Sequence, residues 1–255
     1  MRKLITFCAA AVLILAAGSA HADMLLVQTI PPWWDEDHPE SAIDPSNVMT
    51  ALSIQHAQIS QSEFAAMEAQ KISGYKAILL QGSHQEASLF DKYIIPKMTK
   101  VHDYVKSGGL ALIHYADSFS TTKFTTIGPL GVSRTLGADN TGNIAEGFET
   151  DPLFDSVISL DGWKYTSHGY LTGLPDNADV LIRNSFDEPI YARYTIGLGQ
   201  VWITTMPLEY MGADPYVLQN EIYLANQFVP VPVPAGVLLG MLRLGVAGMK
   251  LRKFV

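Results

Sequence analysis

Three segments of this sequence place histidine, carboxylate, amide or hydroxyl side chains directly after an apolar run. The side chains concerned are Gln81, Ser83 and His84 in the first segment, His114, Tyr115, Asp117 and Ser118 in the second, and Glu209 in the third. A histidine beside a carboxylate can perform acid–base chemistry on a hydroxyl group. Two histidines with two carboxylates could instead ligate a metal ion.

His114 is the central candidate of this set, and three interpretations of it remain open. In the first, which the sequence favours, His114 is a partly buried ring that orders its own loop. In the second, it lies in a pocket and acts as an acid or base together with Glu209 or Asp117. In the third, it is a metal ligand, which the absence of HxH and HxxxH spacing disfavours. We therefore expect neither a metal ion nor a cofactor.

Two adjacent tryptophans form a second candidate site. Trp33 and Trp34 precede the acidic run Asp35–Asp37. Exposed indole rings beside carboxylates can stack on sugar rings and accept their hydroxyl protons. Alternatively, the pair covers the edge of a sheet. Trp33 and Trp34 are thus candidate ligand-binding residues, together with His84 and Tyr115.

Short apolar runs predict the strands that carry these side chains. Runs at 24–30, 77–80 and 110–114 are bounded by turn residues and are typical of buried strands. Helices are predicted between them, with caps at Ser46, Ser62 and Ser88. Apolar strands that alternate with helices predict an α/β fold with a mostly parallel sheet covered on both faces.

The second half of the chain predicts a different connection. Strands are expected at 180–183 and 190–194, and the glycines of Gly197–Gly199 predict a tight turn into a strand at 200–205. An amphipathic helix is predicted from Asp214 to Phe228. This end of the sheet should therefore contain an antiparallel hairpin.

Composition restricts the class of protein. The chain has 255 residues, of which 48% are hydrophobic, which excludes a disordered or collagen-like chain. Its formal net charge of −8 argues against a nucleic-acid binder, whose phosphate contacts need a basic face. No repeat or low-complexity linker interrupts residues 23–228, which we predict to form one domain.

The first 22 residues have the features of a secretory signal peptide. Arg2 and Lys3 form a basic start, Leu4–Ala17 is apolar, and small residues around Ala22 suit cleavage by signal peptidase. The alternative is an uncleaved N-terminal anchor. The only cysteine, Cys8, lies inside this segment, so the mature domain would have no thiol for a disulfide or a nucleophile.

The C-terminal end combines a proline spacer, an apolar segment and basic residues. The spacer consists of Val231, Pro232, Val233, Pro234 and Ala235. Residues 236–249 are apolar except for Arg243, and basic side chains follow from Lys250. This order is a stop-transfer pattern and predicts a transmembrane helix within 229–255. The alternative to a sorting signal is an ordinary single-pass anchor.

This tail resembles the PEP-CTERM sorting signal of exopolysaccharide-producing Gram-negative bacteria, in a V-P-x-P-A variant. The resemblance implies an exosortase-type enzyme that cuts near the proline motif. It also implies transient anchoring in the inner membrane, followed by display at the cell surface or release. Extracellular polysaccharide is the partner that this setting implies.

The body of the chain resembles the class I glutamine amidotransferase-like fold, a flavodoxin-like α/β fold, and its ThuA-like branch. The segments that carry the resemblance are YKAILLQG, VHDYVKSGGLALIHYADS and YTIGLGQVWITTMPLEY. The resemblance places His114 where that family has its catalytic cysteine and Met206 where it has its catalytic histidine. Methionine cannot accept a proton at neutral pH, so glutaminase chemistry is not expected. The ThuA-like branch is linked to carbohydrate metabolism.

Together these features predict an exported protein whose domain lacks the family's catalytic residues and binds carbohydrate or another extracellular ligand. One alternative is a sugar- or polysaccharide-acting enzyme that uses His114 with Glu209 or Asp117. A second alternative is a structural component of an exopolysaccharide or biofilm matrix, which needs no pocket.

Overall fold

A computed structural model describes residues 23–31, 43–83, 86–117, 124–137, 141–157, 160, 167–208 and 216–229. Several predicted features lie outside these residues: the signal peptide, Trp33, Trp34, His84, Ser118, Glu209 and the tail with Val231–Ala235. Within the described part of the chain, no helix is both long enough and apolar enough to cross a bilayer.

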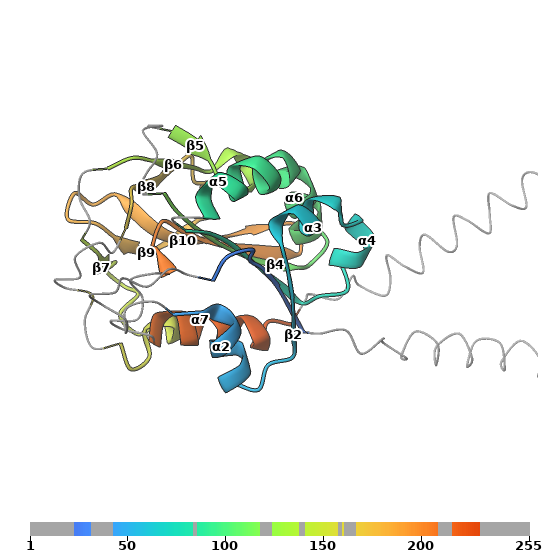
Figure 1. Cartoon of the computed structure of the whole chain (residues 1–255). Coiled ribbons are helices and arrows are strands. Elements are labelled where there is room, and N and C mark those ends of the chain that lie inside the picture. Colours follow the sequence, from blue (N-terminus) through green and yellow to red (C-terminus); the bar gives the residue numbers. More distant parts are fainter. Residues whose placement is uncertain are drawn as a thin grey trace, which may run out of the picture.

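The core of the molecule is an eight-stranded sheet in the order β2-β1-β3-β4-β11-β10-β9-β7 (Figure 1). Its strands are β1 (Met24–Val27), β2 (His56–Ile59), β3 (Ala77–Ser83), β4 (Leu110–Ala116), β7 (Asn143–Ile144), β9 (Asp179–Arg183), β10 (Pro189–Ile196) and β11 (Gly199–Thr204). The first five strands in spatial order are parallel, and the last three are antiparallel. The predicted α/β fold with a mostly parallel sheet is therefore confirmed, as is the β10–β11 hairpin.

Helices cover both faces of this sheet. They are α2 (Pro45–Ala51), α3 (Gln61–Ala66), α4 (Ala69–Ile72), α5 (Ala87–Leu89), α6 (Met98–Lys106) and α7 (Tyr216–Gln227). Figure 1 shows α2 and α7 on one side of the sheet and α3 to α6 on the other. Because side chains alternate along each strand, the sheet separates two hydrophobic clusters.

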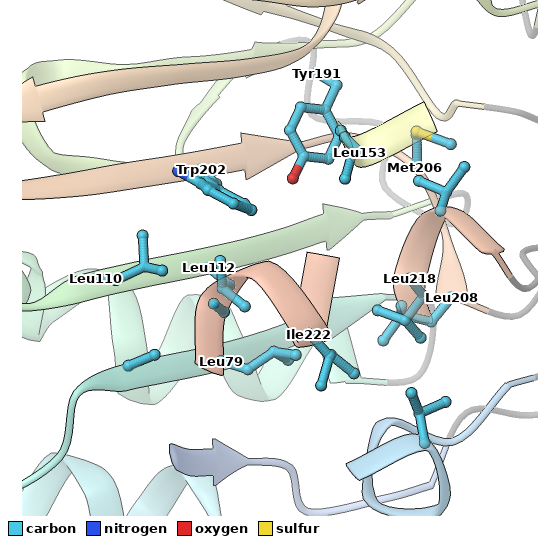
Figure 2. Packing of buried hydrophobic residues seen from close by; sticks show 14 of the residues in the cluster. Leu79, Leu110, Leu112, Leu153, Tyr191, Trp202, Met206, Leu208, Leu218 and Ile222 are labelled. Atoms are coloured by element: carbon cyan, nitrogen blue, oxygen red, sulfur yellow. The ribbon is translucent and has the colours of Figure 1, made fainter. Parts of the chain in front are cut away.

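The cluster beneath α7 shows how the sheet and helices hold together. Leu79, Leu112 and Trp202 extend from three strands toward Leu218 and Ile222 of α7 (Figure 2). Burying an aliphatic side chain of this size contributes about 1.5–3 kcal/mol. These contacts fix α7 against the central strands of the sheet.

A second, three-stranded sheet was not predicted. It consists of β5 (Phe124–Thr126), β6 (Ser133–Thr135) and β8 (Tyr170–Thr172), in the order β5-β6-β8. Strands of three residues are too short to show a clear alternation of polar and apolar residues.

The sequence placed two helix caps two residues too late. Asp44, rather than Ser46, accepts the capping hydrogen bond of α2, and Pro45 takes the first helical position. Ser60, rather than Ser62, caps α3 in a capping box with Glu63. In both cases another residue with a suitable side-chain oxygen precedes the expected one.

The long helix predicted from Ser88 to Gly108 is also interrupted, and its N-cap residue is Glu86, whereas Ser88 lies inside α5. After α5 the chain forms a π-helical turn at Phe90–Ile94 and a 3-10 turn at Ile95–Lys97, and α6 begins only at Met98. Pro96 explains the break, because proline has no N–H and its ring clashes with the carbonyl group four residues earlier. The apolar periodicity of this segment predicted its buried face but not the break.

Candidate functional site

One row of polar side chains crosses four neighbouring strands near the carboxyl ends of β3, β4 and β11. Gln81 is opposite His114, His114 is opposite Thr204, and Thr204 is opposite Tyr191. Residues that are directly opposite in a sheet project from the same face. All four are at most 1% exposed. The row therefore lies in the interior, on the face that α7 covers.

Helix α7 places a carboxylate against this row. Glu221 Oε2 lies 2.6 Å from His114 Nε2, and the Tyr191 hydroxyl donates to Glu221 Oε1 over 2.5 Å. Glu221 belongs to the same helix face as Leu218 and Ile222, so it enters the core with them. Burial raises the pKa of Tyr191 well above its usual value, so the hydroxyl keeps its proton and donates it to the hydrogen bond.

This network differs from the acid–base pair considered from the sequence. The carboxylate hydrogen-bonded to His114 is Glu221, whereas Asp117 follows the end of β4 and Glu209 lies outside the described residues. His114 is 0% exposed and Glu221 is 1% exposed. An imidazole in this position has its geometry fixed by the core beneath α7, and its Nε2 is already paired with Glu221.

Tyr115 lies on the opposite face of β4. Its hydroxyl donates to Asp91 Oδ1 over 2.9 Å, and its ring packs edge-on against Phe90, with 5.2 Å between ring centroids. Burial is the main cause that raises the pKa of both Tyr115 and Asp91. His114 and Tyr115 therefore do not face a common space, although they are adjacent in sequence.

A buried arginine fixes the segment that follows β4. Arg134 of β6 is 0% exposed; its Nη2 donates to the backbone oxygen of Asp117 over 2.5 Å, and its Nε donates to that of His168 over 2.7 Å. These two bonds tie the end of β4 to the small sheet. Asp117 contributes its backbone oxygen to this junction.

The strand order creates a topological switch point between β1 and β3. The chain leaves β1 toward α2 on one face of the sheet and leaves β3 toward α5 on the other (Figure 1). Open α/β sheets bind ligands at the carboxyl ends of strands where the connections diverge in this way. Gln81, which the sequence had already singled out, lies at this point.

Glu86 joins three segments at the switch point. Its Oε1 accepts hydrogen bonds from the backbone N–H groups of Thr29 and Ile30, which follow β1. Its Oε2 accepts a hydrogen bond of 3.0 Å from Gln61 Nε2, and the same nitrogen donates over 2.6 Å to the backbone oxygen of Gln81. The carboxylate therefore holds the exit of β1, the start of α3 and the end of β3 together.

Glu86 titrates close to neutral pH. Burial raises the pKa of its carboxyl group to about 7, although the hydrogen bonds from Ile30 and Thr29 oppose that change. We refer below to Gln28, Gln61, Gln81 and Glu86 as the crevice cluster. All four are at most 2% exposed.

No metal centre is apparent in the described residues. They contain no group of three or more histidine, cysteine, aspartate or glutamate side chains close enough to hold an ion. The candidate ligand-binding residues Trp33, Trp34 and His84 are not described; in the sequence, Gln28–Pro32 separate the tryptophans from the end of β1.

Sequence reasoning missed Glu86, Gln61, Glu221 and Arg134. A signal for Glu221 was present, because it occupies the apolar face of α7 between Leu218 and Ile222. An acid at such a position needs a partner in the core. Glu86 and Gln61 gave no comparable signal, because they lie at helix starts, where polar residues are ordinary.

The sequence matches no protein-family model and no curated protein. Solved structures resemble it in fold. Cytoplasmic protein STM3548 from Salmonella typhimurium superposes with a TM-score of 0.51 at 10% identity, over 82% of this chain and 100% of that one.

Other structures are more distant. Cytoplasmic protein STM1381 from Salmonella typhimurium LT2 gives a TM-score of 0.49 at 12% identity, over 80% of this chain and 97% of that one. A beta-galactosidase from Rahnella sp. R3 gives 0.43 at 14% identity, and the match covers 80% of this chain but 32% of that enzyme. At such low identities the likeness of the first structure establishes that this chain has an α/β fold, and no more than the fold.

Proposed function

We propose that this chain is an exported protein whose domain, residues 23–228, binds an extracellular ligand without chemically changing it. Signal peptidase would remove residues 1–22, and an exosortase-type enzyme would act at Val231–Ala235. The C-terminal helix would hold the protein at the inner membrane before display or release. Carbohydrate is the first ligand class to test, because the setting that the tail resembles is one of polysaccharide export.

The observation that carries the non-catalytic proposal is the burial of the His114 imidazole. General acid–base catalysis requires a side chain within hydrogen-bond reach of the reacting group. His114 Nε2 is instead hydrogen-bonded to Glu221, and the whole side chain is buried beneath α7. The histidine is better suited to fixing α7 on the sheet than to moving a proton on a substrate.

Binding is supported by the crevice cluster at the switch point. It gathers buried polar side chains at the edge where α/β sheets place ligands. No such argument exists for the matrix alternative, which needs no polar cluster at all.

Binding is tested by thermal unfolding of the full chain against neutral sugars, acidic sugars and divalent cations. The protein should be purified in a zwitterionic detergent, since detergents with sugar headgroups would compete. We expect at least one probe to raise the melting temperature without being consumed. If no probe shifts it, the binding proposal fails. Turnover of a probe that is lost in His114→Gln would support the enzyme alternative instead.

Export is tested by fractionating a Gram-negative host that produces the full chain or a variant lacking residues 229–255. We expect the full chain in the envelope and the truncated chain in the soluble exported fraction. A full-length product found soluble inside the cells with both ends intact would contradict the proposal.

A further inference from the structure

Three glutamine side chains are buried together at the switch point. Gln28 is 2% exposed, Gln61 is 0% exposed and Gln81 is 1% exposed. Gln28 follows β1, Gln81 belongs to the neighbouring strand β3, and Gln61 bonds to the backbone of Gln81. The parallel pairing of Val27 with Leu80 places Gln28 beside Gln81. Gln28 and Gln81 therefore project from the same face of the sheet, and Gln61 reaches the end of β3 from α3, which packs on the other face.

Carboxylates fix how two of these amides are oriented. Gln28 Nε2 donates to Asp44 Oδ1 over 3.4 Å, and Gln61 Nε2 donates to Glu86 Oε2. An amide nitrogen facing a carboxylate cannot be exchanged with its oxygen without creating a repulsive contact. The Oε1 atoms of Gln28 and Gln61 are therefore the atoms left to make further contacts.

Four polar atoms of this region are unpaired within the protein. They are Gln28 Oε1, Gln61 Oε1, Gln81 Oε1 and Gln81 Nε2. A buried amide atom without a partner costs free energy comparable to a lost hydrogen bond. Such a group calls for a partner outside the chain, which is an ordered water or a bound ligand. Four in one region, at a switch point, indicate a ligand site.

The unpaired atoms define the chemistry of the ligand. Three of them accept hydrogen bonds, and one, Gln81 Nε2, donates. A cation could contact the three oxygens but would leave the donor unpaired. An anion would meet two carboxylates, Asp44 and Glu86, which already bond to these amides. A hydroxyl group both donates and accepts, so adjacent hydroxyl groups on an uncharged molecule match both kinds of unpaired atom.

We propose that Gln28, Gln61 and Gln81 form a binding site for a neutral ligand with adjacent hydroxyl groups, such as a sugar residue. This inference rests on the proposed function and assigns that function to specific atoms. It places recognition at the switch point between β1 and β3 and not at the His114 network.

The test compares Gln81→Leu with Gln58→Leu in the full chain, because Gln58 is an exposed glutamine on β2. The probes are galactose, mannose, glucose and N-acetylglucosamine, with galacturonate, tetramethylammonium and calcium chloride as charged comparisons. Titration calorimetry measures each affinity. We expect a neutral sugar to bind and its affinity to fall about tenfold or more in Gln81→Leu but not in Gln58→Leu.

If Gln81 had a purely structural role, Gln81→Leu would lower the melting temperature of the unliganded protein. We expect no such decrease, because leucine is close to glutamine in size and the substitution removes two unpaired polar atoms. Should it fail to fold, Gln61→Leu and Gln28→Leu provide the same affinity comparison.

Three outcomes would overturn the inference. A sugar that binds all these variants equally would leave the proposed function standing but place the site elsewhere. Binding of only a charged probe would refute the ligand class. If no probe binds the unmodified protein, the proposed function fails together with the inference.

Discussion

Two buried polar clusters lie at the same edge of the sheet and differ in how completely they are paired. In the network of His114, Glu221 and Tyr191, both carboxylate oxygens, the tyrosine hydroxyl and Nε2 are all bonded, and only His114 Nδ1 is without a partner. In the crevice cluster, four amide atoms are unpaired. The first cluster contains the residue types most often associated with catalysis, whereas the second contains mainly amides.

The difference indicates which cluster stabilises the fold and which is available for a ligand. A paired polar network in a core makes its members costly to remove. Unpaired amides make the opposite prediction, because replacing them with apolar side chains removes a desolvation cost. The comparison can therefore be tested by substitution, beginning with the largest expected effect.

Loss of Glu221 should be the most damaging change. Glu221→Leu leaves His114 Nε2 and the Tyr191 hydroxyl buried without their partner, and should lower the free energy of unfolding by about 3–5 kcal/mol. Glu221→Gln should retain most of that stability, because its amide can accept from Tyr191 and donate to a neutral imidazole. Urea denaturation measures both. A loss below about 1 kcal/mol in Glu221→Leu would mean that the network does not stabilise the fold.

The free energy of unfolding should depend on pH through Glu86 of the crevice cluster. The pKa of Glu86 rises from 4.5 in the unfolded chain to about 7 in the folded protein. The folded state thus binds more protons between these values, and the free energy of unfolding should fall as the pH rises from about 5 to 7.5. The decrease attributable to Glu86 should approach, but not exceed, about 3 kcal/mol.

Urea denaturation at several pH values, with Glu86→Gln alongside, isolates this contribution. The difference in stability between the two proteins should change with pH between about 5 and 7.5. A constant difference for Glu86→Gln would show that its carboxyl group titrates at an ordinary pKa.

Thr204 lies opposite both His114 and Tyr191, and its hydroxyl is fully paired. Its hydroxyl donates to the Ile190 carbonyl over 2.9 Å and accepts from the Met206 N–H over 3.0 Å. Thr204→Val keeps the shape but removes both bonds, so we expect a loss of about 1–3 kcal/mol in urea denaturation. If Thr204→Val is as stable as the unmodified protein, the hydrogen bonds of Thr204 do not stabilise the fold.

Gln81→Leu should have the smallest effect on stability. Its side-chain amide has no partner in the protein, so the unliganded free energy of unfolding should remain unchanged or rise by about 1 kcal/mol. A loss above about 2 kcal/mol would show that the side chain of Gln81 stabilises the fold through hydrogen bonds, as that of Thr204 does.

The strands were predictable because burial on both faces leaves a strong apolar signal. The seven residues of β4, for example, are all buried, and the run 110–114 was evident from sequence. The edge strand β2 and the small sheet were not predicted from the sequence, because their segments are exposed or short and contain no such apolar run. The parallel-to-antiparallel change followed from glycines in the turn at Gly197.

The candidate site was less predictable, because it depends on contacts between distant residues. His114 and Glu221 are 107 positions apart, and nothing local indicates that α7 crosses β4 at that point. The pattern located the correct edge of the sheet through Gln81 and His114. It ended the strand at His114, whereas β4 continues to Ala116, so Tyr115 is a strand residue and points to the face opposite His114.

The most direct test of the account measures how far a bound neutral sugar raises the melting temperature of two variants, Gln81→Leu and His114→Gln. The account predicts that the increase disappears in Gln81→Leu and persists in His114→Gln, even though the latter variant begins from a lower melting temperature. An increase that persists in Gln81→Leu and disappears in His114→Gln would place the ligand at the histidine and contradict the account.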